Sequence, residues 1–99
     1  MKLKTYAFDL DGTLCTEMPT FEKALAQPIQ NRIDKVNKLY DNGNKIIIFT
    51  ARGWQEYNMT LNWLNQNNVK HNLLLCGKPI YDVIIDDRSM DLTLFDDLK

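Results

Sequence analysis

The chain has 99 residues, a length that fits one domain, and we expect residues 1–99 to fold as a single unit. Hydrophobic residues make up 44% of the sequence and the formal net charge is −1, which argues against a disordered chain and against nucleic-acid or anionic-membrane binding. No apolar run reaches the length of a signal peptide or membrane span, and two cysteines are too few for a disulfide scaffold, so we expect reduced thiols and a cytoplasmic location.

The first half of the chain alternates between apolar runs and turn-forming residues. A short apolar run, Leu3 to Leu10, predicts a strand that ends at Asp9. Residues 12–27 carry glycine, threonine and proline and predict a loop that could contain a hairpin or a helical turn. Pro28 suits the first turn of a helix because its missing N–H needs no partner there, and Gly43 suits the end of that helix. The apolar residues that recur on one face of this helix are Ile29, Ile33, Val36 and Tyr40.

The second half continues the same alternation. Residues 45–50 contain the apolar run 46–49, which is rich in β-branched residues and has no polar alternation, the pattern of a strand covered on both faces. Residues 55–67 predict a second helix, and residues 73–76 predict a third strand. A fourth strand is predicted at 83–85, followed by a tail with one short helix within residues 90–99.

This order of strands and helices indicates the α/β fold class with a mainly parallel sheet. Right-handed crossovers place the carboxyl ends of all such strands at one edge of the sheet, where binding sites of open α/β sheets form. The notable polar residues follow the predicted strands, and they are Asp9, Asp11, Thr50, Lys78, Asp86 and Asp87. We therefore expect four separate segments of the chain to meet at one site.

Asp9 and Asp11 suit phosphoryl-transfer chemistry. The two carboxylates lie two residues apart, with Gly12 behind them, where the chain is expected to turn and give each a separate role. One carboxylate could attack phosphorus while the other carries the proton of the leaving group. The alternative is an acidic turn, because Asp and Gly are common turn formers.

Asp86 and Asp87 add two acids at the end of the predicted fourth strand. Adjacent acids after buried aliphatic residues destabilise a fold unless a cation or hydrogen-bond donors lie nearby. Four carboxylates at one edge suit Mg²⁺, which prefers hard oxygen ligands. Alternatively, Asp87 pairs with Arg88 or caps the following turn.

Thr50, Arg52 and Lys78 are candidate ligands for a phosphate group. The Thr50 hydroxyl and the neighbouring loop N–H groups could hold a phosphate oxygen, and Arg52 could add a bidentate contact. The amine of Lys78 would neutralise the carboxylates and stabilise the transferring phosphoryl group. The alternatives are a helix N-cap for Thr50 and solvated surface positions for the two cations.

Taken together, these motifs resemble the four motifs of the haloacid dehalogenase (HAD) superfamily. The matching segments are Asp9 to Thr13, Ile48 to Thr50, Lys78, and Ile84 to Asp87. The resemblance implies a Rossmann-like, three-layer α/β/α core with about four strands in the order 4-1-2-3. The intervals 14–49 and 51–77 leave no room for an inserted cap domain, so the chain resembles a capless member.

The resemblance also implies roles for individual residues. Asp9 would be the nucleophile that forms an aspartyl-phosphate, and Asp11 would protonate the leaving group and then activate water. Mg²⁺ would be held by Asp9, by the backbone carbonyl of Asp11 and by Asp86, directly or through water, with assistance from Asp87. In this resemblance, an acid at Asp11 is the pattern of phosphatases and phosphotransferases rather than of dehalogenases.

In the same resemblance, Thr50 and Lys78 would bind the phosphoryl group. The segments Phe8 to Thr16, Thr50 to Gly53 and Gly77 to Asp82 look like those of small phosphatases of bacterial capsule and surface-polysaccharide biosynthesis, which implies a sugar phosphate or another phosphorylated intermediate, large or sugar-linked, as substrate.

Other functions remain open at this point. The ending 86–88 is similar to that of polynucleotide 3′-phosphatase domains, although the net charge argues against nucleic acid. A non-catalytic module that binds a phospho-ligand or metal on the same fold is a further alternative, as is a phosphotransferase or receiver-like domain in which the aspartyl-phosphate persists. A short sheet also leaves edges that need cover, which is compatible with a homo-oligomer.

Overall fold

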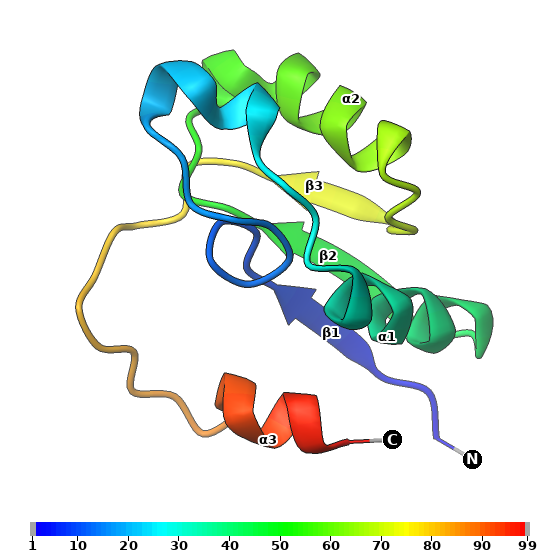
Figure 1. Ribbon diagram of the computed structural model, residues 1–99. Coiled ribbons are helices and arrows are strands. Elements are labelled where there is room, and N and C mark those ends of the chain that lie inside the picture. The colour runs from blue at the N-terminus through cyan, green and yellow to red at the C-terminus, as the bar shows by residue number, and fades with distance from the viewer. Residues whose placement is uncertain (1, 99) are drawn as a thin grey trace.

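Three parallel strands form the sheet, and they lie in the order β1-β2-β3 (Figure 1). The structure, a computed structural model, describes residues 2–98. The strands are β1 (Thr5–Phe8), β2 (Lys45–Phe49) and β3 (Leu73–Leu75). Phe8 lies opposite Ile48, and Ile48 lies opposite Leu74, so the three strands end close to one edge. The predicted α/β class with a parallel sheet is confirmed.

Helices connect these strands in the predicted order. The helical elements are η1 (Thr20–Leu25), α1 (Gln30–Asp41), η2 (Trp54–Glu56), α2 (Tyr57–Gln66) and α3 (Leu92–Asp97), of which η1 and η2 are 3₁₀ helices. The crossover from β1 to β2 contains α1, and the crossover from β2 to β3 contains α2. Both helices and the tail helix fall at or near their predicted positions. Among residues 2–98, no helix has the length and hydropathy needed to cross a bilayer.

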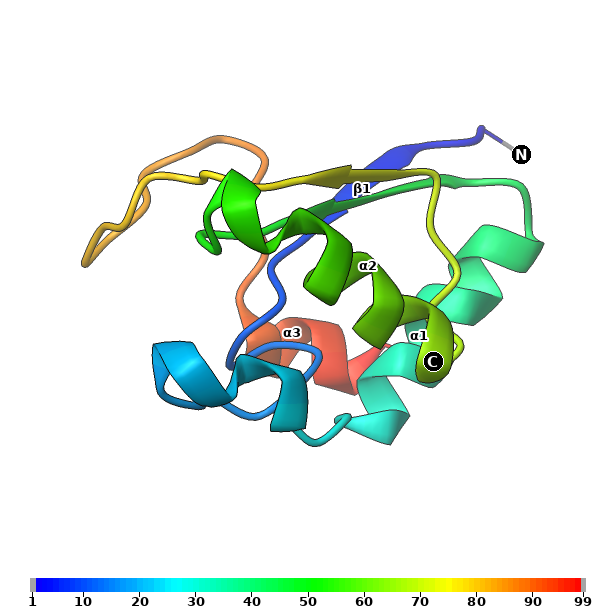
Figure 2. The same cartoon turned by 90° about the horizontal axis from the view of Figure 1, so that it is seen from above.

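The helices cover one face of the sheet, so the described residues form two layers rather than the expected three (Figure 2). Strands that follow one another across a sheet without reversal keep right-handed crossovers on the same side. Burial agrees with this arrangement: Ile46, Ile48 and Leu74 face the helices and are buried, whereas Ile47 and Leu75 on the opposite face are half-buried. The expected third layer depended on the predicted fourth strand, which would lie beside β1 at the edge away from β2.

That fourth strand, predicted at 83–85, is absent from the part of the chain that the structure describes. The chain leaves β3, swings away from the sheet and returns at α3 without pairing to β1 (Figure 1). Ile85 is 95% exposed. Seven residues, 76–82, separate β3 from the aliphatic run, whereas a crossover between parallel strands usually needs a dozen or more. The predicted order 4-1-2-3 is therefore replaced by β1-β2-β3.

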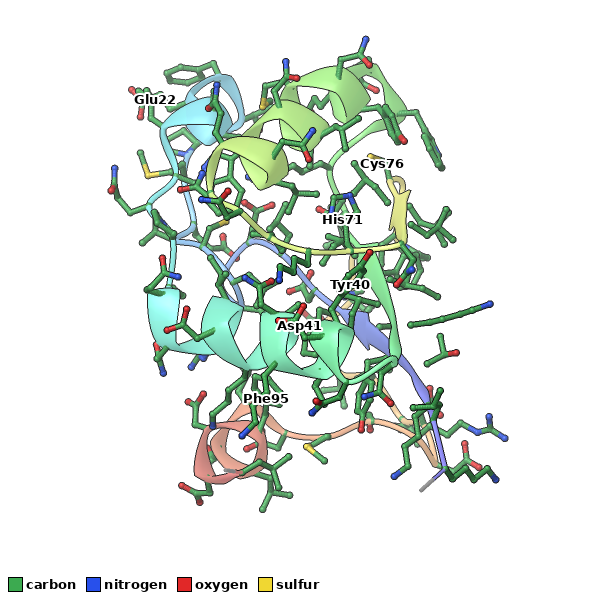
Figure 3. The ribbon with its side chains drawn as sticks, turned by 90° about the vertical axis from the view of Figure 1, so that its right-hand side faces the viewer. Glu22, Tyr40, Asp41, His71, Cys76 and Phe95 are labelled. Carbon is green, nitrogen blue, oxygen red and sulfur yellow. The ribbon has the colours of Figure 1, made fainter. Side chains whose placement is uncertain are left out.

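The tail helix α3 packs against the edge of the core beside α1. Phe95 points from α3 toward α1 (Figure 3), and its ring meets that of Phe8 edge-to-face at a centroid distance of 5.4 Å. The Lys35 amine, from α1, donates a 2.8 Å hydrogen bond to the carbonyl oxygen of Phe95. Arg32 of α1 adds a bidentate ion pair with Asp96. These contacts attach the end of the chain to the first crossover.

Phe95→Ala should lower the free energy of unfolding by about 3 kcal/mol, because it removes a buried aromatic ring and leaves a cavity. Phe95 is 8% exposed, whereas its neighbour Leu94 is 60% exposed. Leu94→Ala is the matched control and should change the stability by less than about 0.5 kcal/mol. Urea denaturation followed by circular dichroism measures both. Equal losses for the two variants would show that α3 does not pack as described.

Candidate functional site

A pocket of about 450 Å³ opens at the carboxyl ends of the strands. Its lining includes Asp9 and Asp11 from the loop after β1, Arg52 from the loop after β2, and Lys78 from the loop after β3. Lys23 of η1 completes one wall. The predicted convergence of separate segments is therefore observed for the first three strands.

Asp9 follows β1 directly, and its carboxylate faces the pocket. One oxygen, Oδ1, lies 3.4 Å from the Lys78 amine, and the other, Oδ2, accepts a hydrogen bond of 3.2 Å from the Thr13 hydroxyl. The side chain remains 39% exposed. A carboxylate that is held at both oxygens and still open to a ligand is placed to act as a nucleophile.

The chain turns sharply after Asp9, and this turn separates the two acids. The N–H groups of Thr13 and Leu14 both donate to the carbonyl oxygen of Leu10, at 3.0 and 2.8 Å. Gly12 has φ of +81°, a conformation that favours glycine because it has no Cβ. Asp11 is consequently directed to a different set of partners from Asp9, as the sequence pattern led us to expect.

Lys78 is placed by hydrogen bonds between two loops. Its own N–H donates to the carbonyl oxygen of Thr50 at 2.9 Å, and the Gly77 N–H donates to that of Arg52 at 2.8 Å. The amine lies 5.2 Å from the centre of the Tyr81 ring. Burial by itself lowers the pKa of Lys78, but contacts with Tyr81 and Asp9 outweigh it and raise that pKa above its ordinary value. The amine is therefore a cation at neutral pH.

Thr50 directly follows β2, is fully buried and does not line the pocket. Its N–H donates to the carbonyl oxygen of Leu75, and its hydroxyl oxygen accepts a 3.1 Å hydrogen bond from the Arg52 N–H. The hydroxyl thus stabilises the turn after β2, a role close to the helix-cap alternative. Its predicted contact with phosphate stays a prediction.

Arg52 lies in the loop after β2 and lines the pocket, as predicted, but its side chain is bound to other residues of the chain. Its Nε and Nη2 atoms donate to the two carboxylate oxygens of Asp11 at 3.0 and 2.9 Å, and Nη1 donates to the Thr60 hydroxyl at 3.3 Å. The side chain is 0% exposed. The guanidinium is thus bound to Asp11 and α2, and the predicted contact of Arg52 with phosphate stays a prediction.

Asp11 is held by two cations. Besides the Arg52 fork, the Lys23 amine lies 3.5 Å from its Oδ2 atom. Burial alone would raise the pKa of Asp11, but the hydrogen bond and charge of Arg52, with the charge of Lys23, outweigh it and hold the pKa below its ordinary value of 3.8. The resting carboxylate is ionised at neutral pH and therefore accepts a proton before it donates one.

Cys15 lies against the same ion pair and is fully buried. Its thiol contacts Oδ1 of Asp11 at 3.6 Å. Burial, together with the negative charge of Asp11, raises the pKa of this thiol to about 12. Both Cys15 and Cys76 are free thiols, in agreement with the expected reduced state. Such a thiol is a poor nucleophile.

Iodoacetamide should therefore modify folded protein slowly at pH 8. A pKa of about 12 in place of 9.0 lowers the thiolate fraction of Cys15 by about a thousandfold, and burial blocks the reagent as well. Mass spectrometry of protein alkylated with and without urea measures the two rates. Equal rates in the two samples would contradict the described burial of this thiol.

Asp86 and Asp87 are not brought to the pocket. Both lie on the exposed segment that leaves the sheet, where Oδ1 of Asp86 accepts a hydrogen bond from the Arg88 N–H. Asp87 lies 3.9 Å from the Arg88 guanidinium, which is the alternative considered for it. Between residues 2 and 98, no three acidic, histidine or cysteine side chains are grouped so that they could hold a metal. The predicted cluster of four carboxylates depended on the fourth strand.

Sequence reasoning did not find Lys23, and it did not find the role of Thr60. Lys23 lies on η1, within a segment expected to be a loop, and no strand end precedes it to indicate a site. Thr60 lies within α2, where a single threonine carries no signal for function. Both became visible when the tertiary structure placed them beside Asp11 and Arg52.

Comparisons with known proteins bear on the fold. No family model and no curated protein matches the chain. The crystal structure of a structural-genomics target from Vibrio cholerae is similar, with a TM-score of 0.80 and 24% sequence identity. The alignment covers 98% of this chain and 90% of that one. This similarity supports the α/β arrangement of the whole chain.

Proposed function

We propose that the chain is a phosphatase of the HAD type, without a cap domain, that hydrolyses a phosphomonoester through an aspartyl-phosphate on Asp9. One observation carries the proposal: a half-exposed carboxylate at the end of β1 faces a protonated lysine at 3.4 Å inside a pocket. The order of the four sequence motifs agrees with this assignment. The pocket volume, about 450 Å³, is in the range of small-molecule sites.

In the first step, an oxygen of Asp9 attacks phosphorus and the bond from phosphorus to the leaving oxygen breaks. The electron pair of that bond stays on the leaving oxygen, which takes a proton from Asp11 after the ionised resting carboxylate has gained this proton from solvent or from the water of the preceding turnover. Lys78 stabilises the negative charge that the phosphoryl oxygens carry during transfer. The products of this step are a free alcohol and an aspartyl-phosphate.

In the second step, water attacks the phosphorus of the aspartyl-phosphate. The Asp11 carboxylate accepts a proton from this water, and the bond from phosphorus to Asp9 breaks. Inorganic phosphate leaves, and the Asp9 carboxylate is restored. The low pKa of Asp11 favours the form needed here, because the carboxylate must be ionised to accept the proton.

Magnesium is part of the proposal as a cofactor to be tested. Asp9 and Asp11 line the pocket and would offer a carboxylate and a backbone carbonyl, but the proposed further ligands Asp86 and Asp87 do not line it. Asp9 and Asp11 would supply only part of an octahedral magnesium shell, and waters and an oxygen of the substrate phosphate would supply the rest, as is usual for magnesium. The steps above are derived from the residues of the chain alone.

The proposed substrate is a sugar phosphate or a related intermediate of polysaccharide biosynthesis. No cap domain covers the pocket within residues 2–98, which leaves room for a large leaving group. The net charge of −1 supports a small molecule over a polynucleotide. The uncovered face of the sheet and the unpaired edge of β1 support a homo-oligomer, which size-exclusion chromatography with light scattering tests.

The experiment that tests the function is hydrolysis of para-nitrophenyl phosphate by the purified chain, with Mg²⁺ and with EDTA. A panel of sugar phosphates and a 3′-phosphorylated oligonucleotide then separates the substrate classes. We expect hydrolysis that requires Mg²⁺ and prefers sugar phosphates. A folded protein that binds Mg²⁺ or phosphate but hydrolyses no member of the panel would instead identify a non-catalytic binding module.

A further inference from the structure

The Arg52–Asp11 pair joins two parts of the chain that are 41 residues apart in sequence. Two parallel hydrogen bonds connect the planar guanidinium to both oxygens of the carboxylate, at 3.0 and 2.9 Å. This bidentate geometry fixes the plane and the rotation of a carboxylate, which a single contact does not. Asp11 lines the pocket, and 14% of its side chain remains exposed there.

Arg52 is itself held on several sides. Its Nη1 atom donates to the Thr60 hydroxyl of α2, and its backbone N–H donates to the Thr50 hydroxyl. Its carbonyl oxygen accepts a hydrogen bond from the N–H of Gly77. The guanidinium is thus held to α2, while the backbone of Arg52 is held to the end of β2 and to the loop that carries Lys78. Because these contacts restrain Arg52, its guanidinium also fixes the orientation of the Asp11 carboxylate that it binds.

We infer that Arg52 is a positioning residue, which orients the Asp11 carboxylate for its proton transfers to the leaving oxygen and from water. The inference rests on the proposed phosphatase function, in which Asp11 is the group that exchanges these protons. It assigns to Arg52 a role through Asp11 in place of direct contact with the phosphate.

Burial separates this role from phosphate binding. The Arg52 side chain is 0% exposed, and a phosphate could reach its donors only after both bonds to Asp11 had broken. Breaking a buried ion pair by removing one partner typically costs several kcal/mol because the other charge is left uncompensated. Lys78 and the solvent-facing part of the pocket offer a phosphate an easier approach, since the Lys78 amine already faces the Asp9 carboxylate.

The dependence of the rate on the leaving group distinguishes the two roles. A good leaving group such as para-nitrophenolate departs with little help from an acid, whereas phenolate or a sugar alkoxide needs a proton in the transition state. Misplacement of Asp11 should therefore lower kcat/KM far more for substrates with poor leaving groups than for substrates with good ones. Loss of a phosphate-binding cation should affect all substrates alike, because each carries the same phosphoryl group.

The test measures kcat/KM of wild type and Arg52→Lys on para-nitrophenyl phosphate, phenyl phosphate and a sugar phosphate. Lysine keeps the charge but lacks the planar fork. We expect a loss of less than about tenfold on para-nitrophenyl phosphate and of about a hundredfold on phenyl and sugar phosphates, in the range of general acid catalysis. An equal loss on all three substrates would overturn the inference.

A double-mutant cycle with Asp11→Asn tests whether Arg52 acts through Asp11. If it does, Arg52→Lys should cause almost no further loss of kcat/KM once the carboxylate is gone. Independent, additive losses would contradict the positioning role. Asp96→Asn is the matched control, because it weakens a bidentate arginine pair of similar geometry outside the pocket, and its leaving-group dependence should equal that of wild type.

Circular dichroism shows whether each variant is folded. If Arg52→Lys does not fold, Thr60→Val replaces it in the same assay, because this change removes the acceptor of Nη1 and loosens the guanidinium while leaving its charge. The expected result is the same selective loss on poor leaving groups, at a smaller size, and a uniform loss contradicts the inference. An inactive wild type would instead refute the proposed function itself, so the two failures are distinguishable.

Discussion

Asp9→Asn should lower kcat/KM for para-nitrophenyl phosphate by at least about a thousandfold, roughly 4 kcal/mol in the barrier. The amide has nearly the shape of the carboxylate but cannot attack phosphorus as an anion. It also loses the charge that faces the Lys78 amine at 3.4 Å. Because the side chain is 39% exposed, we expect the fold to tolerate the change. Steady-state kinetics and circular dichroism measure the two effects.

Asp41→Asn is the matched control for this variant. Asp41 is an exposed acid on α1 that pairs with Lys70, away from the pocket. Its replacement should leave kcat/KM within about twofold of wild type, because exposed ion pairs contribute little to stability. A folded Asp9→Asn variant with near wild-type activity would exclude Asp9 as the nucleophile, and it would remove the basis of the proposed mechanism.

Lys78→Met should lower kcat by about a hundredfold to a thousandfold. Methionine keeps most of the apolar length of the lysine but removes the cation that would stabilise the transferring phosphoryl group. The pKa of Lys78 lies above its ordinary value, so the wild-type amine is charged throughout the neutral range and its removal deletes a full charge. KM should rise as well, since the same cation would contact the phosphate of the bound substrate. Steady-state kinetics at neutral pH measure both constants.

Lys70→Met provides the matched control for Lys78→Met. Lys70 makes an ion pair with Asp41 in which both side chains are about half exposed, and it does not line the pocket at the strand ends. This variant should retain wild-type kcat and KM. If both variants lost activity to a similar degree, the loss would reflect general electrostatics or stability, and the direct role of Lys78 would be contradicted.

The sequence by itself determined the elements whose signals are local. The apolar runs before Asp9 and before Thr50 predict β1 and β2 because short apolar runs bounded by turn residues are typical of strands. The parallel order then places Asp9 and Lys78 at one edge, since right-handed crossovers align the carboxyl ends of the strands. In the structure the Lys78 amine lies 3.4 Å from an Asp9 carboxylate oxygen, as the positions of both residues after predicted strands led us to expect.

Only the tertiary structure decided whether the segment 83–85 pairs with a strand and which side chains Asp86 and Arg52 contact. The aliphatic run 83–85 has the local pattern of a strand, yet it does not pair, because its place depends on a connection back to β1 that local pattern does not describe. Because the segment 83–85 does not pair with β1, Asp86 also stays away from Asp9 and Asp11. Arg52 reaches Asp11 across 41 positions of sequence, and such a contact is set by how α2 and the strand-end loops pack rather than by the residues beside it.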